Sequence, residues 1–382
     1  QFFESLFAAK PSRCRKLHNI AEAVVILDEA QLMPIEFLNP ILETMQLLVD
    51  NYKVSFVIST ATQPAFKERI VDGQRFKGLK EIREIMGEEE EVKRLYASLV
   101  RCKIHFPEDM QAVSSWEQVS DELKNYDQVL CVVSDRKSCR ELHKLMPVGT
   151  YHLSALMCGQ HRSKVIAEIK EKLKDGEIVR VVSTQLVEAG VDFDFPVVYR
   201  ALAGLDSIIQ AAGRCNREGN LPGLGQVIVF NPPRKPPEGI LRKAADTTRS
   251  IIAMDKELTN QAYFEKYFKE LYWKANSLDS KDIANLLDPS KNNIKECSIY
   301  FRTAANKFKI IDDTMQKTVF VRYGEGDGLI ELLKSKGPDR WLLRKLQRYS
   351  VNIFNHDFIK LRARGAIQEI YPEIYALSSS LD

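Results

Sequence analysis

Short apolar runs alternate with a longer amphipathic stretch in the first sixty residues of the chain. Residues 24–27 and 54–59 form two such runs, and both are predicted to be strands. The stretch between them, residues 37–48, carries apolar residues at helical spacing: Leu38, Ile41, Leu42, Met45 and Leu48. This order of strand, helix and strand predicts a parallel sheet with helices on its faces.

A second block with the same alternation follows after residue 100. The pattern predicts strands at 129–133, 151–153, 178–182 and 226–230, and helices at 138–145, 163–173 and 207–215. Continuous β-branched runs separated by helices are typical of a parallel sheet that is buried on both faces. The sequence therefore predicts an α/β fold with two parallel-sheet lobes, of which the first is incomplete.

Prolines mark the end of this alternation. The stretch "NPPRKPPEG" at 231–239 contains four of them and predicts a domain edge. Residues 241–286 read as helical and aromatic, and short strands with a glycine turn at 323–328 follow from about residue 296. We expect the rear part of the first lobe at 1–100, the second lobe at 101–231, a linker with helices at 232–295, and a small α+β domain at 296–382.

The composition limits the kinds of partner. Of 382 residues, 55 are basic and 52 acidic, so the net charge of +3 is too small to indicate nucleic-acid binding over the whole surface. No apolar run approaches the roughly 18 residues that span a bilayer, so no membrane partner is expected. The seven cysteines form no C-x-x-C pair and predict reduced thiols in a cytoplasmic protein: Cys14, Cys102, Cys131, Cys139, Cys158, Cys215 and Cys297.

Polar side chains directly follow both strands of the first lobe. Asp28 and Glu29 come after the strand at 24–27, at the carboxyl end where α/β sheets bind ligands. One acid there can hold Mg²⁺ while its neighbour accepts a proton from the water that attacks a nucleotide. The "STAT" stretch at 59–62 follows the next strand, and its hydroxyls can bridge two sites. Both stretches are also consistent with a plain loop start and a helix cap.

A third polar stretch lies in the second lobe. "VVSTQLVEAGVDFDF" at 181–195 is followed by "SIIQAAGRCNREG" at 207–219. If residues 207–215 continue as a helix, Gln210, Arg214 and Arg217 share one face. Two arginines on one face could neutralise the charge on a γ-phosphate during phosphoryl transfer. A surface helix with two arginines is common, so this stretch alone is ambiguous.

The order of these stretches resembles the superfamily 2 helicases. DEAQ, STAT, STQ-x-x-E-x-G-x-D and Q-x-x-G-R-x-x-R occur in that order on two α/β blocks. Residues 1–31, 56–66 and 183–219 look, more specifically, like the CRISPR-associated helicase–nuclease of type I systems. DEAD-box RNA helicases usually have His-Arg where this chain has Gln210-Ala211, and Asp where it has Gln31, which favours a DNA translocase.

The resemblance implies two RecA-like lobes that use ATP and Mg²⁺, and it implies a role for each matching residue. Asp28 would bind Mg²⁺, and Glu29 would act as the catalytic base. Arg214 and Arg217 would stabilise the transition state. The remaining matches fall into three groups: Gly190, Asp192 and Gln210 at the nucleotide; Ser59 and Thr62 in coupling ATP to DNA; Ser154, Ser183 and Thr184 at the DNA phosphates.

The resemblance also implies partners. The family acts on single-stranded DNA exposed by an RNA-guided surveillance complex in prokaryotes, and a nuclease domain with divalent metal ions degrades that DNA. Neither this domain nor the phosphate-binding loop G-x-x-x-x-G-K-[ST] occurs in the 382 residues. We therefore expect a fragment whose partner is the missing nuclease and first-lobe portion, covalent or as a separate chain, and which alone is inactive. The lone His356–Asp357 pair is expected to be structural.

Two other functions remain open at this point. The chain could be a non-catalytic module that docks on DNA or on the surveillance complex, or a superfamily 2 RNA helicase. The aromatic stretch at 263–273 could stack on bases, but its spacing favours core packing. The basic stretch at 340–351 could follow a DNA strand, but its pattern favours an amphipathic helix with its charges in solvent.

Overall fold

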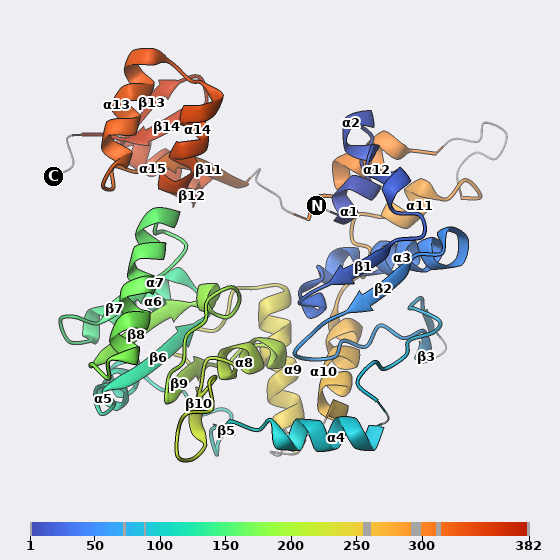
Figure 1. The fold of residues 1–382 in the computed structure, drawn as a ribbon, viewed down its shortest axis with the longest axis horizontal. Helices are drawn as coiled ribbons and strands as arrows, with labels where there is room; N and C mark the ends of the chain where they lie inside the picture. The colour runs from blue at the N-terminus through green and yellow to red at the C-terminus, as the bar shows by residue number, and fades with distance from the viewer. Residues whose placement is uncertain are drawn as a thin grey trace. The chain divides into compact units, whose positions relative to one another are not determined.

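The computed structural model describes residues 2–71, 74–87, 89–254, 261–291, 299–310 and 315–379. These residues form two compact units: Gln1–Val100, Ala203–Ile209 and Glu238–Ile311 make up the first, and Arg101–Leu202, Gln210–Pro237 and Asp312–Asp382 the second. Figure 1 labels helices and strands of both units. Cys297 lies outside the described residues.

The first unit contains the predicted strand–helix–strand element. Strands β1 (Val24–Leu27) and β2 (Ser55–Ile58) pair in parallel, from Val24 opposite Ser55 to Leu27 opposite Ile58. Helix α3 (Leu38–Tyr52) connects them and extends four residues beyond the predicted end. The carboxyl ends of both strands therefore lie side by side, which brings the segments after residues 27 and 58 together.

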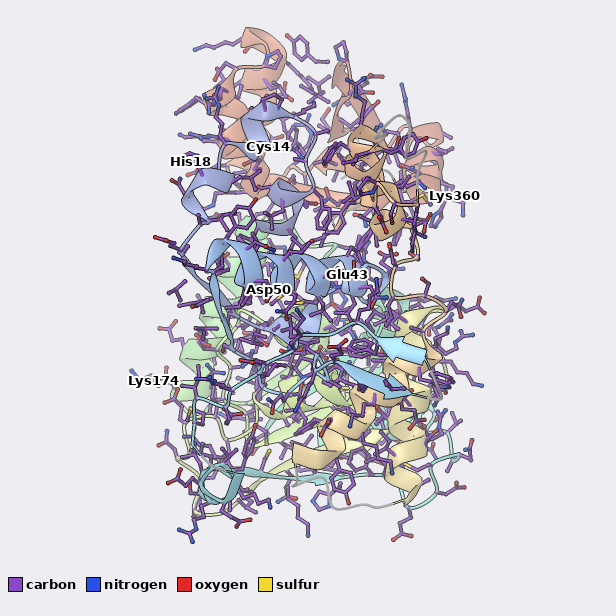
Figure 2. All side chains as sticks on the ribbon, turned by 90° about the vertical axis from the view of Figure 1, so that its right-hand side faces the viewer. Cys14, His18, Glu43, Asp50, Lys174 and Lys360 are labelled. Atoms are coloured by element: carbon purple, nitrogen blue, oxygen red, sulfur yellow. The ribbon has the colours of Figure 1, made fainter. Side chains whose placement is uncertain are left out.

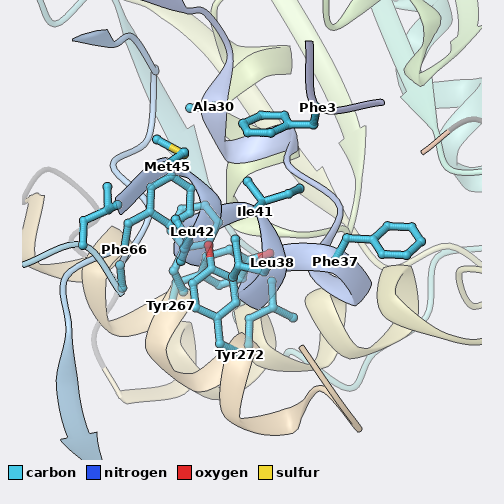
Figure 3. Packing of buried hydrophobic residues seen from close by; sticks show 14 of the residues in the cluster. Phe3, Ala30, Phe37, Leu38, Ile41, Leu42, Met45, Phe66, Tyr267 and Tyr272 are labelled. Atoms are coloured by element: carbon cyan, nitrogen blue, oxygen red, sulfur yellow. The ribbon is translucent and has the colours of Figure 1, made fainter. Parts of the chain in front are cut away.

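Helix α3 is the centre of the first unit's core. It is packed between Phe3 of α1 (Phe2–Leu6) and the aromatic helix α10 (Gln261–Lys274), whose Tyr267 and Tyr272 lie in the same cluster (Figure 3). The side chains of the aromatic stretch that were expected to pack are buried: Phe264, Tyr267, Phe268 and Leu271. The prediction of core packing is confirmed for these four side chains, which are not available for base stacking, whereas Trp273 is 56% exposed.

Shorter elements complete the first unit. The helices are α2 (Pro11–Cys14), α4 (Glu89–Ser98), α9 (Ile240–Met254), α11 (Ile283–Leu287) and α12 (Phe301–Lys307). A hairpin of β3 (Arg69–Val71) and β4 (Gln74–Phe76) leads into a segment that crosses α3. Glu43 and Asp50, which project from α3 (Figure 2), hold this segment through ion pairs of 2.7 Å to Lys77 and 2.8 Å to Lys80.

The second unit is built on a six-stranded sheet in which every pairing is parallel. The strand order is β5-β10-β9-β6-β8-β7. The strands are β5 (Cys102–His105), β6 (Gln128–Val133), β7 (Tyr151–Leu153), β8 (Val179–Thr184), β9 (Val197–Ala201) and β10 (Gly225–Phe230). The α/β fold with parallel sheets is thereby confirmed, although the sequence pattern predicts neither β5 nor β9.

Helices cover both faces of this sheet. Side chains of α5 (Trp116–Lys124) and α6 (Arg136–Leu145) cluster with Val129, Cys131 and Val133 of β6. Those of α7 (Gly159–Lys174) and α8 (Leu205–Ala212) cluster with Leu130 and Val132, which point to the opposite face. The alternation along β6 thus places two helices on each side of the sheet.

The helix predicted at 207–215 is wrong in its last three residues, because α8 ends at Ala212. After Gly213 the chain turns and pairs with Phe195: the Phe195 N–H donates to the Arg214 carbonyl and the Asn216 N–H donates to the Phe195 carbonyl, both at 2.9 Å. The Arg214 and Cys215 N–H groups still donate to the Ala211 and Ala212 carbonyls, at 3.0 and 2.9 Å, but in bonds that span three residues and not the four of an α-helix. Arg214 and Arg217 therefore do not share a helical face with Gln210.

The C-terminal part of the second unit is a small α+β layer, as predicted. Its mixed sheet has the order β12-β11-β14-β13, formed by β11 (Gln316–Phe320), β12 (Ser350–Phe354), β13 (Ile367–Tyr371) and β14 (Ile374–Leu377). Helices α13 (Gly326–Lys336) and α14 (Arg340–Leu346) pack on one face, and α15 (Asn355–Ala363) on the other. In α14, Leu342 and Leu346 are buried while Arg344 and Lys345 are exposed, which confirms the amphipathic helix for residues 340–346. The end of the predicted stretch, from Ser350, belongs to β12.

The C-terminal sheet also contacts the loop between β7 and α7. Cys158 is buried in the same cluster as Val319, Tyr349 and Phe358, and the ring of His161 stacks on Tyr323 with centroids 4.3 Å apart. Within the described part of the chain, no helix combines the length and the apolar character needed to cross a membrane.

Candidate functional site

The first group of candidate residues lies at the carboxyl ends of β1 and β2. The Ser59 hydroxyl donates to Asp28 Oδ1 at 3.0 Å, and the Glu29 N–H donates to the same oxygen at 3.0 Å. Glu29 has a φ of 52°, in the left-handed region, so the backbone turns sharply directly after the strand. Asp28 and Ser59, which come from different strands, are brought together by the parallel register.

A buried glutamine connects Glu29 to the STAT segment. The Gln31 amide donates from Nε2 to Glu29 Oε2 at 2.5 Å, and its Oε1 accepts from the Thr60 hydroxyl. Only 7% of Gln31 is exposed, so both bonds are largely shielded from water. The orientation of the Glu29 carboxylate is therefore linked, through one side chain, to the segment that follows β2.

Thr60 and Thr62 occupy different environments in this segment. Thr60 Oγ1 lies 2.7 Å from the Thr62 carbonyl and accepts from the Thr62 N–H at 3.2 Å. Thr62 is fully buried, and its hydroxyl has no hydrogen-bond partner among the described residues. Of the two hydroxyls expected to couple nucleotide and DNA, that of Ser59 contacts Asp28. The hydroxyl that bonds Gln31, the partner of Glu29, is that of Thr60 and not that of Thr62.

In the second unit, the loop at residues 187–192 organises two of the candidate arginines. Arg214 donates from Nε to the Val187 carbonyl at 2.8 Å and from Nη2 to the Glu188 carbonyl at 2.5 Å. Arg217 forms an ion pair of 3.0 Å with Asp192, and both of these side chains are partly exposed. Arg214 is thus held by backbone oxygens and buried, whereas Arg217 lies nearer the surface.

The turn before Asp192 depends on glycine. Gly190 has a φ of +72°, a conformation that side-chain-bearing residues rarely adopt. The chain then continues to Asp194, whose carboxylate accepts the Arg217 N–H at 2.7 Å and the Glu218 N–H at 3.4 Å. The acids at 192 and 194 therefore fix the side chain and the backbone of Arg217, respectively.

The other candidates of the second unit lie at strand ends or in α8. Ser183 and Thr184 are the last residues of β8, and the Ser183 hydroxyl donates to the Thr184 carbonyl at 2.8 Å. Ser154 follows β7 and is buried, and its hydroxyl accepts the Leu156 N–H at 3.4 Å. Gln210 lies in the last turn of α8 with 8% of its surface exposed. The hydroxyls of Ser154 and Ser183 thus make hydrogen bonds to the nearby backbone.

Sequence reasoning assigned no contact to four residues of these networks. Gln31 bonds Glu29 and Thr60, and Glu188 and Arg200 form a buried ion pair of 2.9 Å beside the anchors of Arg214. A signal for the second pair exists in the sequence, because Arg200 interrupts the apolar run "VVYRAL" and Glu188 interrupts "QLVEAG". Charged residues inside apolar runs indicate buried partners.

The residues at the end of β1 suit a magnesium ion. Asp28 is an exposed carboxylate with a serine hydroxyl beside it, and Mg²⁺ prefers oxygen ligands from one or two carboxylates. No group of three or more His, Cys, Asp or Glu side chains that could hold a metal ion occurs in the described ranges. His356 and Asp357 form an exposed pair at 3.1 Å.

Comparisons with known proteins point to one family. Residues 118–220 match the family model described as the C-terminal part of the CRISPR-associated nuclease/helicase Cas3. A curated Cas3 nuclease/helicase of Methanothermobacter thermautotrophicus is 24% identical over 87% of this chain and 44% of its own length. The enzyme of the same name from Haloferax volcanii is 34% identical over 38% of this chain and 19% of its length.

Solved structures are similar to this chain in fold. The structure of T. fusca Cas3 with ATP matches with a TM-score of 0.60 and 14% identity, over 98% of this chain and 52% of that protein. A CRISPR RNA-guided surveillance complex in a pre-nicking state contains a chain that matches with a TM-score of 0.54 and 13% identity. This chain thus spans less than half of the two curated relatives and about half of the solved one.

Proposed function

We propose that this Cas3-type helicase chain is part of an ATP-dependent motor that moves along single-stranded DNA. The observation that carries the proposal is the contact network at the ends of β1 and β2. There, Ser59 donates to Asp28, and Gln31 connects Glu29 with Thr60. A motor has to link ATP hydrolysis to a conformational change elsewhere in the molecule. This network connects the acid pair after β1 with the segment that follows β2.

The acid pair supplies two functions in this proposal. Asp28 would hold Mg²⁺, which when bound neutralises charge on the phosphate oxygens. Glu29 would orient the attacking water and take its proton, and the 2.5 Å contact with Gln31 Nε2 keeps its carboxylate in one orientation. The phosphate-binding loop that would complete the nucleotide site, G-x-x-x-x-G-K-[ST], does not occur in this sequence.

The arginines of the second unit would provide positive charge for the transferred phosphoryl group. Arg217 is the more accessible of the two, with 41% of its side chain exposed. Arg214, which is anchored on two carbonyls, would act from a fixed position. Solved structures of T. fusca Cas3 include complexes with ATP, ADP and AMPPNP, which supports a nucleotide as the ligand.

Single-stranded DNA is the proposed track, and a type I RNA-guided surveillance complex the proposed protein partner. The hydroxyls of Ser154, Ser183 and Thr184 at the strand ends would contact DNA phosphates. Gln31 and Gln210 stand where RNA helicases of the DEAD-box group usually have Asp and His, which supports DNA over RNA. Delivery of the strand to a nuclease domain, with its own divalent metal ions, belongs to the same proposal.

ATP hydrolysis by this chain, alone and joined to a polypeptide that supplies the phosphate-binding loop, tests the proposal. We expect turnover only in the completed protein and stimulation by single-stranded DNA over RNA. Arg214→Ala should lower turnover strongly, to a small residual rate, with DNA binding retained. Stimulation by RNA alone would favour an RNA helicase. An assembled, DNA-binding protein that never hydrolyses ATP would leave a binding module instead.

A further inference from the structure

The second unit contains a fully buried ion pair outside the residues assigned above. Arg200 lies in β9 with none of its surface exposed, and its Nε is 2.9 Å from Glu188 Oε1. Its Nη1 donates to the Ala201 carbonyl at 2.9 Å and to the Val132 carbonyl of the neighbouring strand β6 at 3.3 Å. Burial of a charge is unfavourable unless the charge is paired, so the guanidinium of Arg200 requires the carboxylate of Glu188 beside it.

Glu188 belongs to the same short loop that holds the candidate arginines. Its backbone carbonyl accepts from Arg214 Nη2, the preceding Val187 carbonyl accepts from Arg214 Nε, and Asp192 pairs with Arg217. Glu188 is 6% exposed, and its side chain is directed to Arg200 rather than to solvent. Glu188 therefore connects the loop to the sheet through its side chain, which pairs with Arg200, and accepts a hydrogen bond from Arg214 through its backbone carbonyl.

We propose that Glu188 and Arg200 are positioning residues, which set the place of Arg214 by fixing the loop at 187–192 to the middle of the sheet. Arg200 is in register with Val132 between two paired strands, which makes it a rigid anchor. A displacement of Glu188 would move the two carbonyls that orient the Arg214 guanidinium. This inference rests on the proposed role of Arg214 in ATP hydrolysis.

The alternative is that the pair only stabilises the core. The two roles differ in kinetics: a positioning role lowers kcat for ATP at nearly constant KM, because the guanidinium is misplaced only for the transition state. A purely structural role lowers the melting temperature but leaves kcat per folded molecule unchanged. Misplacement of a catalytic group by about 1 Å can cost up to about 100-fold in rate.

The test is a double-mutant cycle in the completed, ATP-hydrolysing protein. We expect Glu188→Gln to lower kcat roughly 10- to 100-fold, and to have no further effect when Arg214→Ala is already present. DNA binding should be retained in both. If Glu188→Gln does not fold, Glu188→Asp takes its place, because it retains the charge opposite Arg200 but shortens the connection to the loop.

The control is Asp127→Asn, which removes an ion pair with Arg180 in the same unit at 3.9 Å, with 79% of the Asp127 side chain exposed. It should leave kcat unchanged. Equal relative losses from the Glu188 variant with and without Arg214 would overturn the inference while leaving the proposed function intact. A completed wild-type protein without ATP turnover would overturn both.

Discussion

Replacement of Gln31 by leucine is the most direct test of the contact network in the first unit. Leucine has a similar volume, so the buried site stays filled, but it removes the bond from Nε2 to the Glu29 carboxylate and the acceptor for Thr60. We expect the variant to fold and to bind nucleotide while its hydrolysis of ATP slows. The carboxylate of Glu29 would then be free to rotate away from the attacking water.

The size of the effect follows from the kind of bond that is lost. A hydrogen bond to a charged group contributes about 1.5–3 kcal/mol, and Gln31 is 7% exposed, so solvent replaces little of it. If that energy orients Glu29 only in the transition state, kcat falls roughly 10- to 150-fold, since each 1.36 kcal/mol is a factor of about ten. The KM for ATP should change little.

The assay is steady-state ATP hydrolysis by the completed protein with saturating single-stranded DNA. Gln46→Leu is the matched control, because Gln46 makes the same kind of bond, 2.7 Å from Nε2 to Asp50 Oδ1, on the outer side of α3. The reasoning is refuted if folded Gln31→Leu hydrolyses ATP at the wild-type rate. It is also refuted if the two leucine variants lose activity equally.

Three further predictions concern stability and thiol reactivity. Tyr267→Phe should lower the free energy of unfolding by about 1.5–3 kcal/mol in urea titrations, because the buried hydroxyl donates to the Asp206 carboxylate at 2.8 Å. Burial lowers the pKa of His152, so protonation favours the unfolded state; the melting temperature should fall as the pH drops from about 7 to about 5, and less so in His152→Gln. Burial raises the pKa of Cys139 to about 12, whereas a hydrogen bond from the neighbouring Cys215 thiol lowers the pKa of Cys102. Mass spectrometry should therefore find Cys102 alkylated before Cys139.

Each of these has a clear contrary outcome. Tyr52, which is 56% exposed, supplies the control for the first, since Tyr52→Phe should leave stability unchanged. An equal acid-induced loss in wild type and in His152→Gln would exclude His152 as the cause. Alkylation of Cys139 before Cys102 in the folded protein would contradict the burial argument.

The elements that the sequence predicts are those whose signal is local. The apolar runs at β1 and β6 and the helical spacing along α3 each depend on residues within a few positions of one another. Strand β9 is not predicted, because Arg200 interrupts its apolar run and becomes compatible with the core only through Glu188, twelve positions earlier in the chain. That partner is set by the tertiary fold.

The same limit applies to the candidate site. The order of the polar motifs selects Asp28, Glu29, Arg214 and Arg217, but helical periodicity places the arginines on one face of a helix that in fact ends at Ala212. Beyond Ala212 the chain pairs with Phe195, a contact between distant segments that the periodicity of residues 207–215 does not encode. The shared helical face expected from the spacing therefore does not form, whereas the roles of the two arginines stay predictions.

The contact of the C-terminal sheet with the loop after β7 has a consequence for deletion experiments. The sulfur of Cys158 is buried among residues of that sheet, and Leu156 packs against the same cluster. Removal of the C-terminal residues would uncover these two side chains in the loop that begins at Ser154. A truncated protein would therefore combine loss of the domain with damage to a neighbouring loop, and substitutions on the outer face of α14 would separate the two effects.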